Sequence, residues 1–313
     1  MVLVIGDLNV DVVARTSAWP RPGDESEAPW AEIRRGGAGG NVAAWLAWLG
    51  IEARIFARIG DDPWGEFIVR ELARLGIRTG FVQRDPAEGT GVVVSLIDPT
   101  GERAMITCPG ANAALEADGL EGAMRGADCV YLSGYVARRC PGVARHALGR
   151  ARALGIPVCL DLNPLFTAGD LRTFGTEGLT LVFGTERELA GPGKVREAFV
   201  KRGPRGCIWR RGRRELEIPG FAATVRDTTG AGDAFVAGAI AARLRGHGPR
   251  LQGLVGNLCG ALSTMGHRPP QVPLEAAKAL VEGADLTRGE RLAIGAFLEE
   301  RKRRDDGVKD PVP

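Results

Sequence analysis

Asp233 stands directly after Gly230, Ala231 and Gly232 in the segment DTTGAGDAF, residues 227–235, and an apolar stretch of small residues follows it. We expect a helix to begin near Ala231, with its first amides unpaired and the positive end of its dipole facing outward. The two glycines would let a phosphate group approach the main chain. A carboxylate that accepts a hydroxyl proton, beside amides that bind phosphate oxygens, suits phosphoryl transfer to an alcohol. The alternative is a glycine-rich turn in which Asp233 only caps the helix.

A second glycine-dense turn lies upstream, in the segment RRGGAGGNVAAWLAWLG, residues 34–50, and it leads into another helix at Asn41. Asn41 could be a simple helix cap. Four glycines within five positions exceed what a cap or turn needs, and they suggest a backbone that lies flush against a polyhydroxylated or otherwise close-fitting ligand.

The elements that must position these turns alternate between strand and helix. Residues 2–6 form a buried strand, which we expect to continue through Asp7, Asn9 and Asp11 with these polar groups on one face. Parallel strands with intervening helices predict an α/β fold with a doubly wound, mostly parallel sheet, whose ligands bind beyond the carboxyl ends of the strands. Two alternating β runs flank the turn DPTG, residues 98–101, and predict a hairpin that forms part of a lid. We expect one domain over residues 1–300, a β lid from about 12–35 and 85–108, and a charged flexible tail over 301–313.

The composition narrows the class of protein. The chain has 313 residues, with 41 basic and 38 acidic side chains and a net charge of +3. That balance gives no case for binding nucleic acid or a membrane. The six cysteines are scattered and form no CxxC pair, so a reducing cytoplasmic setting is the simplest expectation. No GxxxxGK[ST] phosphate loop is present, and GGAGGN does not fit the dinucleotide fingerprint GxGxxG. A dinucleotide-dependent oxidoreductase is therefore disfavoured.

The two glycine turns in this order resemble the signatures of the ribokinase/phosphofructokinase-B family of sugar kinases, as GGAGGNVA and DTTGAGD. The segments GDLNVD, TGERAMITCPGANAAL and VKRGPRG are similar to the family's opening strand, its lid strand and its nucleotide-binding strand, so the resemblance spans roughly residues 1–280.

The resemblance implies a role for each matching position. Asp233 would be the catalytic base, and the amides of Gly230, Ala231 and Gly232 would form the anion hole. The sugar would be bound by Asn9, Asp11, Gly36, Gly37 and Asn41. ATP would lie near Lys201, Gly203, Gly206 and Asn257, although Asn257 could equally be an ordinary helix residue. Glu188 would help to hold Mg²⁺ through water, and Asp227 and Thr229 match positions at the family's monovalent-cation site, so K⁺ is a further expectation.

Two departures from the family's pattern bear on function. Thr185 replaces the usual asparagine of an N-x-x-E motif, which weakens the Mg²⁺ assignment to Glu188. Ala38 replaces the lysine that ribokinases and phosphosugar kinases often carry, which disfavours a phosphorylated substrate without excluding one. We therefore expect ATP-dependent phosphorylation of a small, unphosphorylated sugar or sugar acid. A nucleoside kinase and a catalytically silent sugar- or nucleotide-binding protein remain alternatives. Asp233 is expected to be ionised at neutral pH, and the lid is expected to pair two copies into a homodimer.

Overall fold

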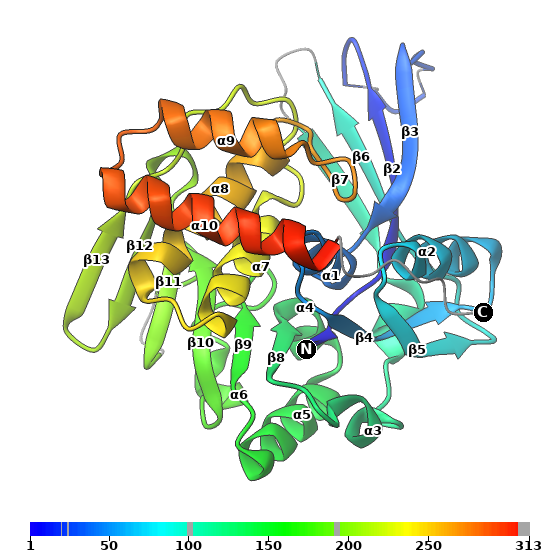
Figure 1. Cartoon of the computed structure of the whole chain (residues 1–313). Helices are drawn as coiled ribbons and strands as arrows, with labels where there is room; N and C mark the ends of the chain where they lie inside the picture. Colours follow the sequence, from blue (N-terminus) through cyan, green and yellow to red (C-terminus); the bar gives the residue numbers. More distant parts are fainter. Residues whose placement is uncertain (20, 24, 99–102, 191–194, 306–313) are drawn as a thin grey trace.

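Two separate β-sheets organise the chain, whose computed structural model describes residues 1–19, 21–23, 25–98, 103–190 and 195–305. Within these residues the main sheet has nine strands, in the spatial order β13-β12-β11-β10-β9-β8-β1-β4-β5 (Figure 1). The strands are β1 (Val2–Ile5), β4 (Ala53–Gly60), β5 (Arg78–Asp85), β8 (Cys129–Ser133), β9 (Val158–Asp161), β10 (Leu179–Thr185), β11 (Glu197–Lys201), β12 (Cys207–Arg211) and β13 (Arg214–Ile218). All neighbouring pairs from β5 to β11 are parallel, and β12 and β13 complete one edge as an antiparallel pair.

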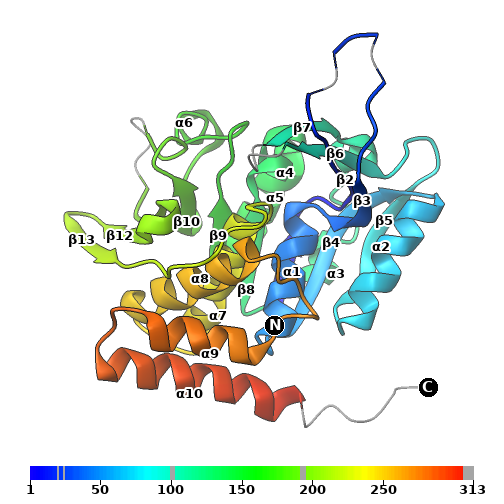
Figure 2. The same cartoon turned by 90° about the horizontal axis from the view of Figure 1, so that it is seen from above.

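Helices cover both faces of the main sheet, as the parallel strands require. They are α1 (Ala38–Trp48), α2 (Pro63–Arg74), α3 (Leu120–Met124), α4 (Gly134–Arg139), α5 (Pro141–Leu154), α6 (Leu171–Phe174), α7 (Ala231–Leu244), α8 (Pro249–Thr264), α9 (Leu274–Gly283) and α10 (Arg288–Asp305), with short 3₁₀ turns at Gly110–Ala114 and Gly203–Arg205. Strand β1 shows the two-sided packing: Val2 and Val4 belong to the hydrophobic cluster of α1, α7 and α8, while Leu3 and Ile5 belong to that of α3 and α5. Figure 2 shows α9 and α10 as an outer layer beyond α7 and α8.

The second sheet is built from the segments expected to form the lid. Its four strands, β2 (Asn9–Arg15), β3 (Trp30–Gly36), β6 (Gly91–Ile97) and β7 (Arg103–Cys108), lie in the order β3-β2-β6-β7. They rise from the main body beside α1 and α2 (Figure 1). We call this four-stranded sheet the lid. Of the expected DPTG turn, the positions after Asp98 lie outside the described residues.

Two sequence-based expectations need correction. The chain breaks between β1 and β2, so Asn9 and Asp11 belong to the lid and Asp7 lies in the connection, not on one continuous strand. The helix α10 was not predicted, and it runs to Asp305, so the first five residues of the expected tail are helical. The rest of that tail, 306–313, lies outside the described residues.

Candidate active site

A cleft of about 1010 Å³ lies where the carboxyl ends of the main-sheet strands face the lid. Residues that follow β1, β8, β9 and β11 line it, together with the start of α7 and the lid strands β6 and β7. This position follows the rule for open α/β sheets, because β1 is flanked by β4 on one side and β8 on the other, so the chain order reverses there.

Asp233 lies in the first turn of α7 and lines this cleft. The helix begins at Ala231, as the sequence predicts, after Gly230 in a left-handed conformation with φ of 77°. The carboxylate Oδ2 of Asp233 accepts a hydrogen bond of 2.8 Å from Nδ2 of Asn41, which belongs to α1. The two glycine turns therefore meet at one carboxylate, although they lie far apart in the sequence.

The protonation of Asp233 differs from the sequence-based expectation. Burial raises its pKa from 3.8 to about 7, the nearby Asp161 and Asp7 add to the increase, and the hydrogen bond from Asn41 and the charge of Lys201 oppose it. The expectation of an ionised group came from the helix dipole alone, and desolvation outweighs that effect here. A carboxyl group with a pKa near 7 is a stronger base than an ordinary aspartate, and its pKa matches what general-base catalysis at neutral pH requires.

The backbone amides at the start of α7 differ in whether they already donate a hydrogen bond within the protein. The amide of Ala231 donates to the carbonyl of Thr228 at 3.3 Å, so it is partly engaged within the turn. Among the described residues, the amides of Gly230 and Gly232 have no such acceptor. These two amides, with the end of the helix dipole, are thus the better donors for an anion.

Lys201, at the end of β11, brings an ammonium group to the same place. Its Nζ forms an ion pair of 2.7 Å with Oδ1 of Asp161, and a Cβ atom added to Gly232 would lie only 3.3 Å from Nζ. Burial raises the pKa of Asp161 to about 6 against the opposing charge of Lys201. Lys201 lines the cleft, and its role in binding the nucleotide stays a prediction. Asp161 was missed, although its position at the carboxyl end of the buried strand β9 is a recognisable signal.

The connection after β1 forms the wall of the cleft nearest the lid. Asp7 accepts hydrogen bonds from the Ser133 hydroxyl at 3.2 Å and from the Asn9 side chain at 3.3 Å, and burial raises its pKa. Asn112 donates to Asn9 Oδ1 at 2.9 Å and also binds both the amide and the carbonyl of Leu8. Asn9 therefore lines the cleft as predicted, in an orientation that Asn112 fixes.

Gly36, just before α1, and Gly39, in its first turn, pack closely against other parts of the chain. A Cβ atom on Gly39 would lie 2.7 Å from the backbone of Gly6, and one on Gly36 would lie 2.0 Å from Oδ1 of Asp11. Gly36 does not line the cleft, so its prediction as a sugar-binding residue is wrong: it makes room for the Asp11 carboxylate. Gly37 and Asp11 do line the cleft. Burial raises the pKa of Asp11 to about 6, and Arg34, with Nε 4.0 Å from Oδ2, counteracts the increase.

The surroundings of Asp227 argue against a monovalent cation. Its Oδ2 accepts hydrogen bonds from Arg34 at 3.0 Å and from Arg268 at 2.6 Å, and its Oδ1 accepts one from the amide of Thr229 at 2.8 Å. Arg103 donates to the Thr229 hydroxyl at 2.7 Å. Two guanidinium groups thus hold Oδ2 and the Thr229 amide holds Oδ1, the oxygens that a K⁺ ion would need. Burial raises the pKa of Asp227, but the hydrogen bonds from Thr229, followed by the charges of Arg268 and Arg34, outweigh it and lower the pKa to about 2.

Glu188 lines the cleft, but part of its bonding capacity is used locally. Its Oε2 accepts from the amide of Thr185 at 2.7 Å, and the Glu188 amide donates back to the Thr185 hydroxyl at 3.3 Å. No cluster of three potential ligand side chains exists among the residues that the structure describes. Mg²⁺ bound to nucleotide phosphates keeps several waters and needs only one or two carboxylates, so Glu188 and the nearby Asp161 fit a water-mediated site.

The other half of the cleft is less polar. Gly203 and Gly206 line it with Phe221, Ala222 and Val225, an environment suited to the flat face of a nucleotide base. Asn257 also lines it, but its side chain donates to the carbonyl of Pro219 at 2.8 Å. At least one amide hydrogen of Asn257 therefore holds the loop after β13 in place.

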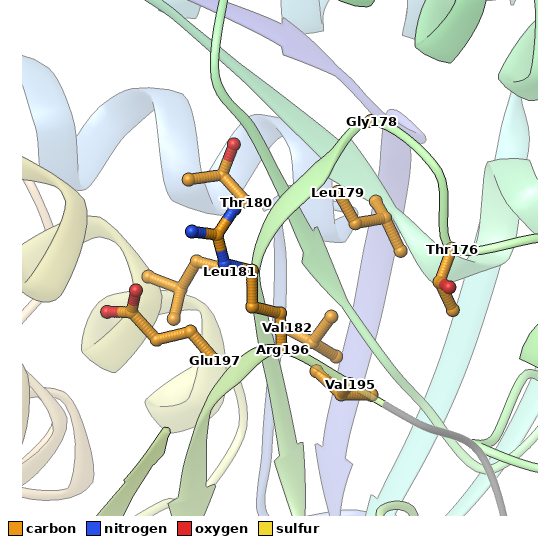
Figure 3. Close-up of a pocket in the computed structure, with 9 residues that line it drawn as sticks. All are labelled: Thr176, Gly178, Leu179, Thr180, Leu181, Val182, Val195, Arg196 and Glu197. Carbon is orange, nitrogen blue, oxygen red and sulfur yellow. The ribbon is translucent and has the colours of Figure 1, made fainter. Parts of the chain in front are cut away.

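A second hollow, of about 220 Å³, lies at the opposite edge of the sheet, between the starts of β10 and β11 (Figure 3). Figure 3 shows the side chain of Leu181 beside that of Glu197, and the side chain of Val182 next to that of Val195. Glu197 already pairs with Arg243 at 2.8 Å and accepts from Trp209 at 3.0 Å. This hollow lacks the convergent polar groups of the main cleft.

Comparison with known proteins identifies the class of protein that this fold and cleft define. The structure of Arabidopsis thaliana ribokinase complexed with ribose and ATP superimposes with a TM-score of 0.77 at 22% identity, covering 90% of this chain and 99% of that one. That likeness establishes a ribokinase-like α/β fold.

A family model for pfkB family carbohydrate kinases matches residues 1–269, and the chain belongs to this family. An ATP-dependent ribose-1-phosphate kinase from Halopiger xanaduensis is 32% identical over 315 residues, which cover 96% of this chain and 98% of that protein. A deoxyribokinase from Salmonella typhi is 25% identical over 254 residues, covering 75% and 83%. The chain is thus a kinase with an alcohol acceptor, as the paired glycine turns predicted.

Proposed function

We propose that this protein transfers the γ-phosphate of ATP to a hydroxyl group of a small sugar or sugar derivative, with Asp233 as the general base. The observation that carries the proposal is the convergence of Asp233, Asn41 and the two unpaired amides of the α7 start on one cleft. In this arrangement the hydroxyl proton passes to the Asp233 carboxylate while the alcohol oxygen bonds to the γ-phosphorus, and the bond from that phosphorus to the β,γ-bridging oxygen breaks to release ADP.

The remaining residues of the site orient the Asp233 carboxylate and the sugar, and they neutralise the negative charge of the phosphates. Asn41 fixes the Asp233 carboxylate through the 2.8 Å hydrogen bond. The amides of Gly230 and Gly232 and the ammonium of Lys201 lie where the transferred group would carry negative charge, and such fixed donors stabilise a transition state without reorganising. Mg²⁺, near Glu188 and Asp161, would shield charge on the nucleotide phosphates. Asn9 and Asp11 would hold sugar hydroxyls against the lid, and lid closure would exclude water.

The test is acceptor-dependent release of ADP. The purified protein is incubated with ATP, Mg²⁺ and one acceptor at a time, taken from pentoses, hexoses, their monophosphates, aldonic acids and nucleosides. We expect ADP formation that requires an acceptor. ATP binding without turnover of any acceptor would instead favour a silent sugar- or nucleotide-binding protein, and a nucleoside as the sole acceptor would favour a nucleoside kinase.

We also propose that the lid pairs two copies into a homodimer. One row of apolar side chains crosses all four lid strands on the face opposite the cleft: Ile33, Val12, Val94 and Ile106 are register neighbours. Ile33 is 50% exposed and Ile106 is 69% exposed, which is unusual for such a row in a monomer. Light scattering should give a dimer mass for the natural chain and a monomer mass for Ile106→Arg, with Leu154→Arg, exposed on α5, as a matched control that stays dimeric. A monomeric natural chain would refute this proposal.

We expect the protein to act in the cytoplasm without membrane or nucleic-acid partners. All six cysteines are free thiols and five are buried, which fits a reducing compartment. Of the described helices, none combines the length and apolar character needed to cross a bilayer.

A further inference from the structure

Both edge strands of the lid contact the same turn of the main body, residues 227–229, which precedes α7. The edge strands are β3 and β7. From β3, Arg34 Nη2 donates to Asp227 Oδ2 at 3.0 Å. From β7, Arg103 Nη1 donates to the Thr229 hydroxyl at 2.7 Å. The lid therefore holds this turn from both of its edges.

The 227–229 turn leads directly into the amides that we propose to bind phosphate. Asp227 Oδ1 accepts a hydrogen bond of 2.8 Å from the amide of Thr229, which closes the turn. Gly230 follows, and Gly232 lies in the first turn of α7. Because these residues are continuous in the chain, the position of the turn sets where their amides point. Fixed donors stabilise a developing charge only if their neighbours hold them in place. Groups that hold the turn thus act on phosphoryl transfer without touching the phosphate.

Arg34 also lies beside Asp11, the carboxylate that we expect to bind the acceptor. Each nitrogen of its guanidinium group faces a different carboxylate: Nη2 is 3.0 Å from Asp227 Oδ2, Nη1 is 3.7 Å from Glu32 Oε2, and Nε is 4.0 Å from Asp11 Oδ2. The Nε atom is buried and has no hydrogen-bond partner among the described residues. Asp11 lines the cleft and Arg34 does not. Arg34 therefore connects an acceptor-binding group to the 227–229 turn from behind the lining of the cleft.

We propose that Arg34 is a positioning residue that couples acceptor binding at Asp11 to the arrangement of the phosphate-binding amides. This inference rests on the kinase function proposed above. The guanidinium group is planar and rigid, so its nitrogens move together. An acceptor that fixes Asp11 therefore also fixes Asp227 and the turn that it closes. Arg103 holds the same turn at Thr229 and limits its movement away from the lid.

Arg268 separates this role from simple neutralisation of charge. It donates to the same Asp227 Oδ2, at 2.6 Å, but it comes from the loop between α8 and α9 in the main body. The variant Arg268→Met thus removes one positive charge from Asp227 and leaves the link to the lid in place. The variant Arg34→Met removes both the charge and the link.

The first experiment measures how strongly the acceptor promotes binding of a mimic of the transferred phosphate. The dissociation constant of ADP with aluminium fluoride is measured by calorimetry, with and without the acceptor that the ADP-release assay identifies. For the natural chain and for Arg268→Met, the acceptor should lower this constant about 10-fold, a usual size for coupling between two sites. For Arg34→Met this coupling should disappear, while ADP alone binds as it does to the natural chain. Coupling that persists in Arg34→Met, or that Arg268→Met loses to the same extent, would overturn the proposal.

The second experiment uses Arg34→Lys, which keeps the charge and remains informative if Arg34→Met fails to fold. A lysine is a point charge and cannot hold two carboxylates in one fixed geometry. We therefore expect kcat to fall about 10-fold, with the KM for ATP little changed and the coupling lost. Arg15→Lys is the matched control, because Arg15 is an exposed lid arginine on β2 that lies over the Trp30 ring, and it should keep the natural kcat and coupling. Full activity of Arg34→Lys would mean that charge alone suffices, which would refute the bridging role.

The coupling and the kinase function fail in different ways. If the natural chain releases no ADP with any acceptor, the kinase function falls and the coupling falls with it. If the natural chain is active and Arg34→Lys keeps its full coupling, only the role of Arg34 is refuted.

Discussion

Replacing the proposed base by its amide, Asp233→Asn, should reduce activity and increase stability at the same time. A positioned general base contributes about 10²–10⁴-fold to turnover, so kcat should fall by that factor while the KM for ATP changes little. The amide oxygen can still accept the hydrogen bond from Asn41. The loss would therefore reflect proton transfer rather than a collapsed site.

The gain in stability follows from the raised pKa. Burial lifts the pKa of Asp233 from 3.8 to about 7, and a group with a raised folded-state pKa contributes stability that is present at low pH and lost as the pH rises through about 7. A shift of about three units corresponds to about 4 kcal/mol as an upper bound. Because the side chain still faces the water of the cleft, we expect about 1–2 kcal/mol after screening. The neutral asparagine escapes this cost.

Thermal melting and steady-state kinetics at pH 5 and pH 8 test both effects. The variant should melt about 2–6 °C higher than the natural protein at pH 8, and the difference should shrink at pH 5, where the natural carboxyl group keeps its proton in the folded state. For the natural enzyme, kcat should fall as the pH drops below about 7, because only the ionised carboxylate accepts a proton. A variant with near-full turnover, or one that melts lower at pH 8, would refute the assignment of Asp233 as a buried base.

Three further predictions concern the groups around this base. Because two guanidinium groups already bind Asp227, turnover should be the same in K⁺ as in Na⁺ or tetramethylammonium salts, and a strict K⁺ requirement would contradict that geometry. Lys201→Met should raise the KM for ATP and also destabilise the fold by about 3–5 kcal/mol, because Asp161 would be left buried without its partner. The double variant Lys201→Met/Asp161→Asn should melt at a higher temperature than Lys201→Met alone. If it does not, loss of the ion pair is not the cause of the lower stability. Gly36→Ala should raise the KM for the sugar and leave the KM for ATP unchanged, because the new Cβ would displace the Asp11 carboxylate. A rise in the KM for ATP alone would contradict this link between Gly36 and Asp11.

Much of the candidate site could be predicted because parallel strands end at one edge of the sheet. Asp233 and Asn41 were placed at helix starts, Asn9 and Asp11 along the first strand, and Lys201 by resemblance, and all five line the cleft. The same rule could have found Asp161, which directly ends the buried strand β9. The helix α10 was missed because its sequence is strongly polar, and only its contact with the core, through residues such as Ile294 and Phe297, orders it.

The glycine turn before α1 shows how one pattern can have the right place and the wrong reason. Its density suggested a backbone exposed to a ligand, yet Gly39 is needed because the α1 start passes within contact of Gly6 after β1. A glycine-rich sequence indicates that there is no room for side chains at those positions, but it does not identify the neighbouring group that fills the space. That information depends on which distant segment the fold brings alongside.

Ion pairs between segments that lie far apart in the sequence were the feature that the sequence analysis could least predict. By resemblance, Asp227 belonged to a monovalent-cation site, but Arg34 comes to it from the lid, 193 positions earlier, and Arg268 from the loop after α8. A guanidinium group supplies the same positive charge as a bound K⁺ ion and cannot dissociate, so the turn before α7 is neutralised without an exchangeable ion.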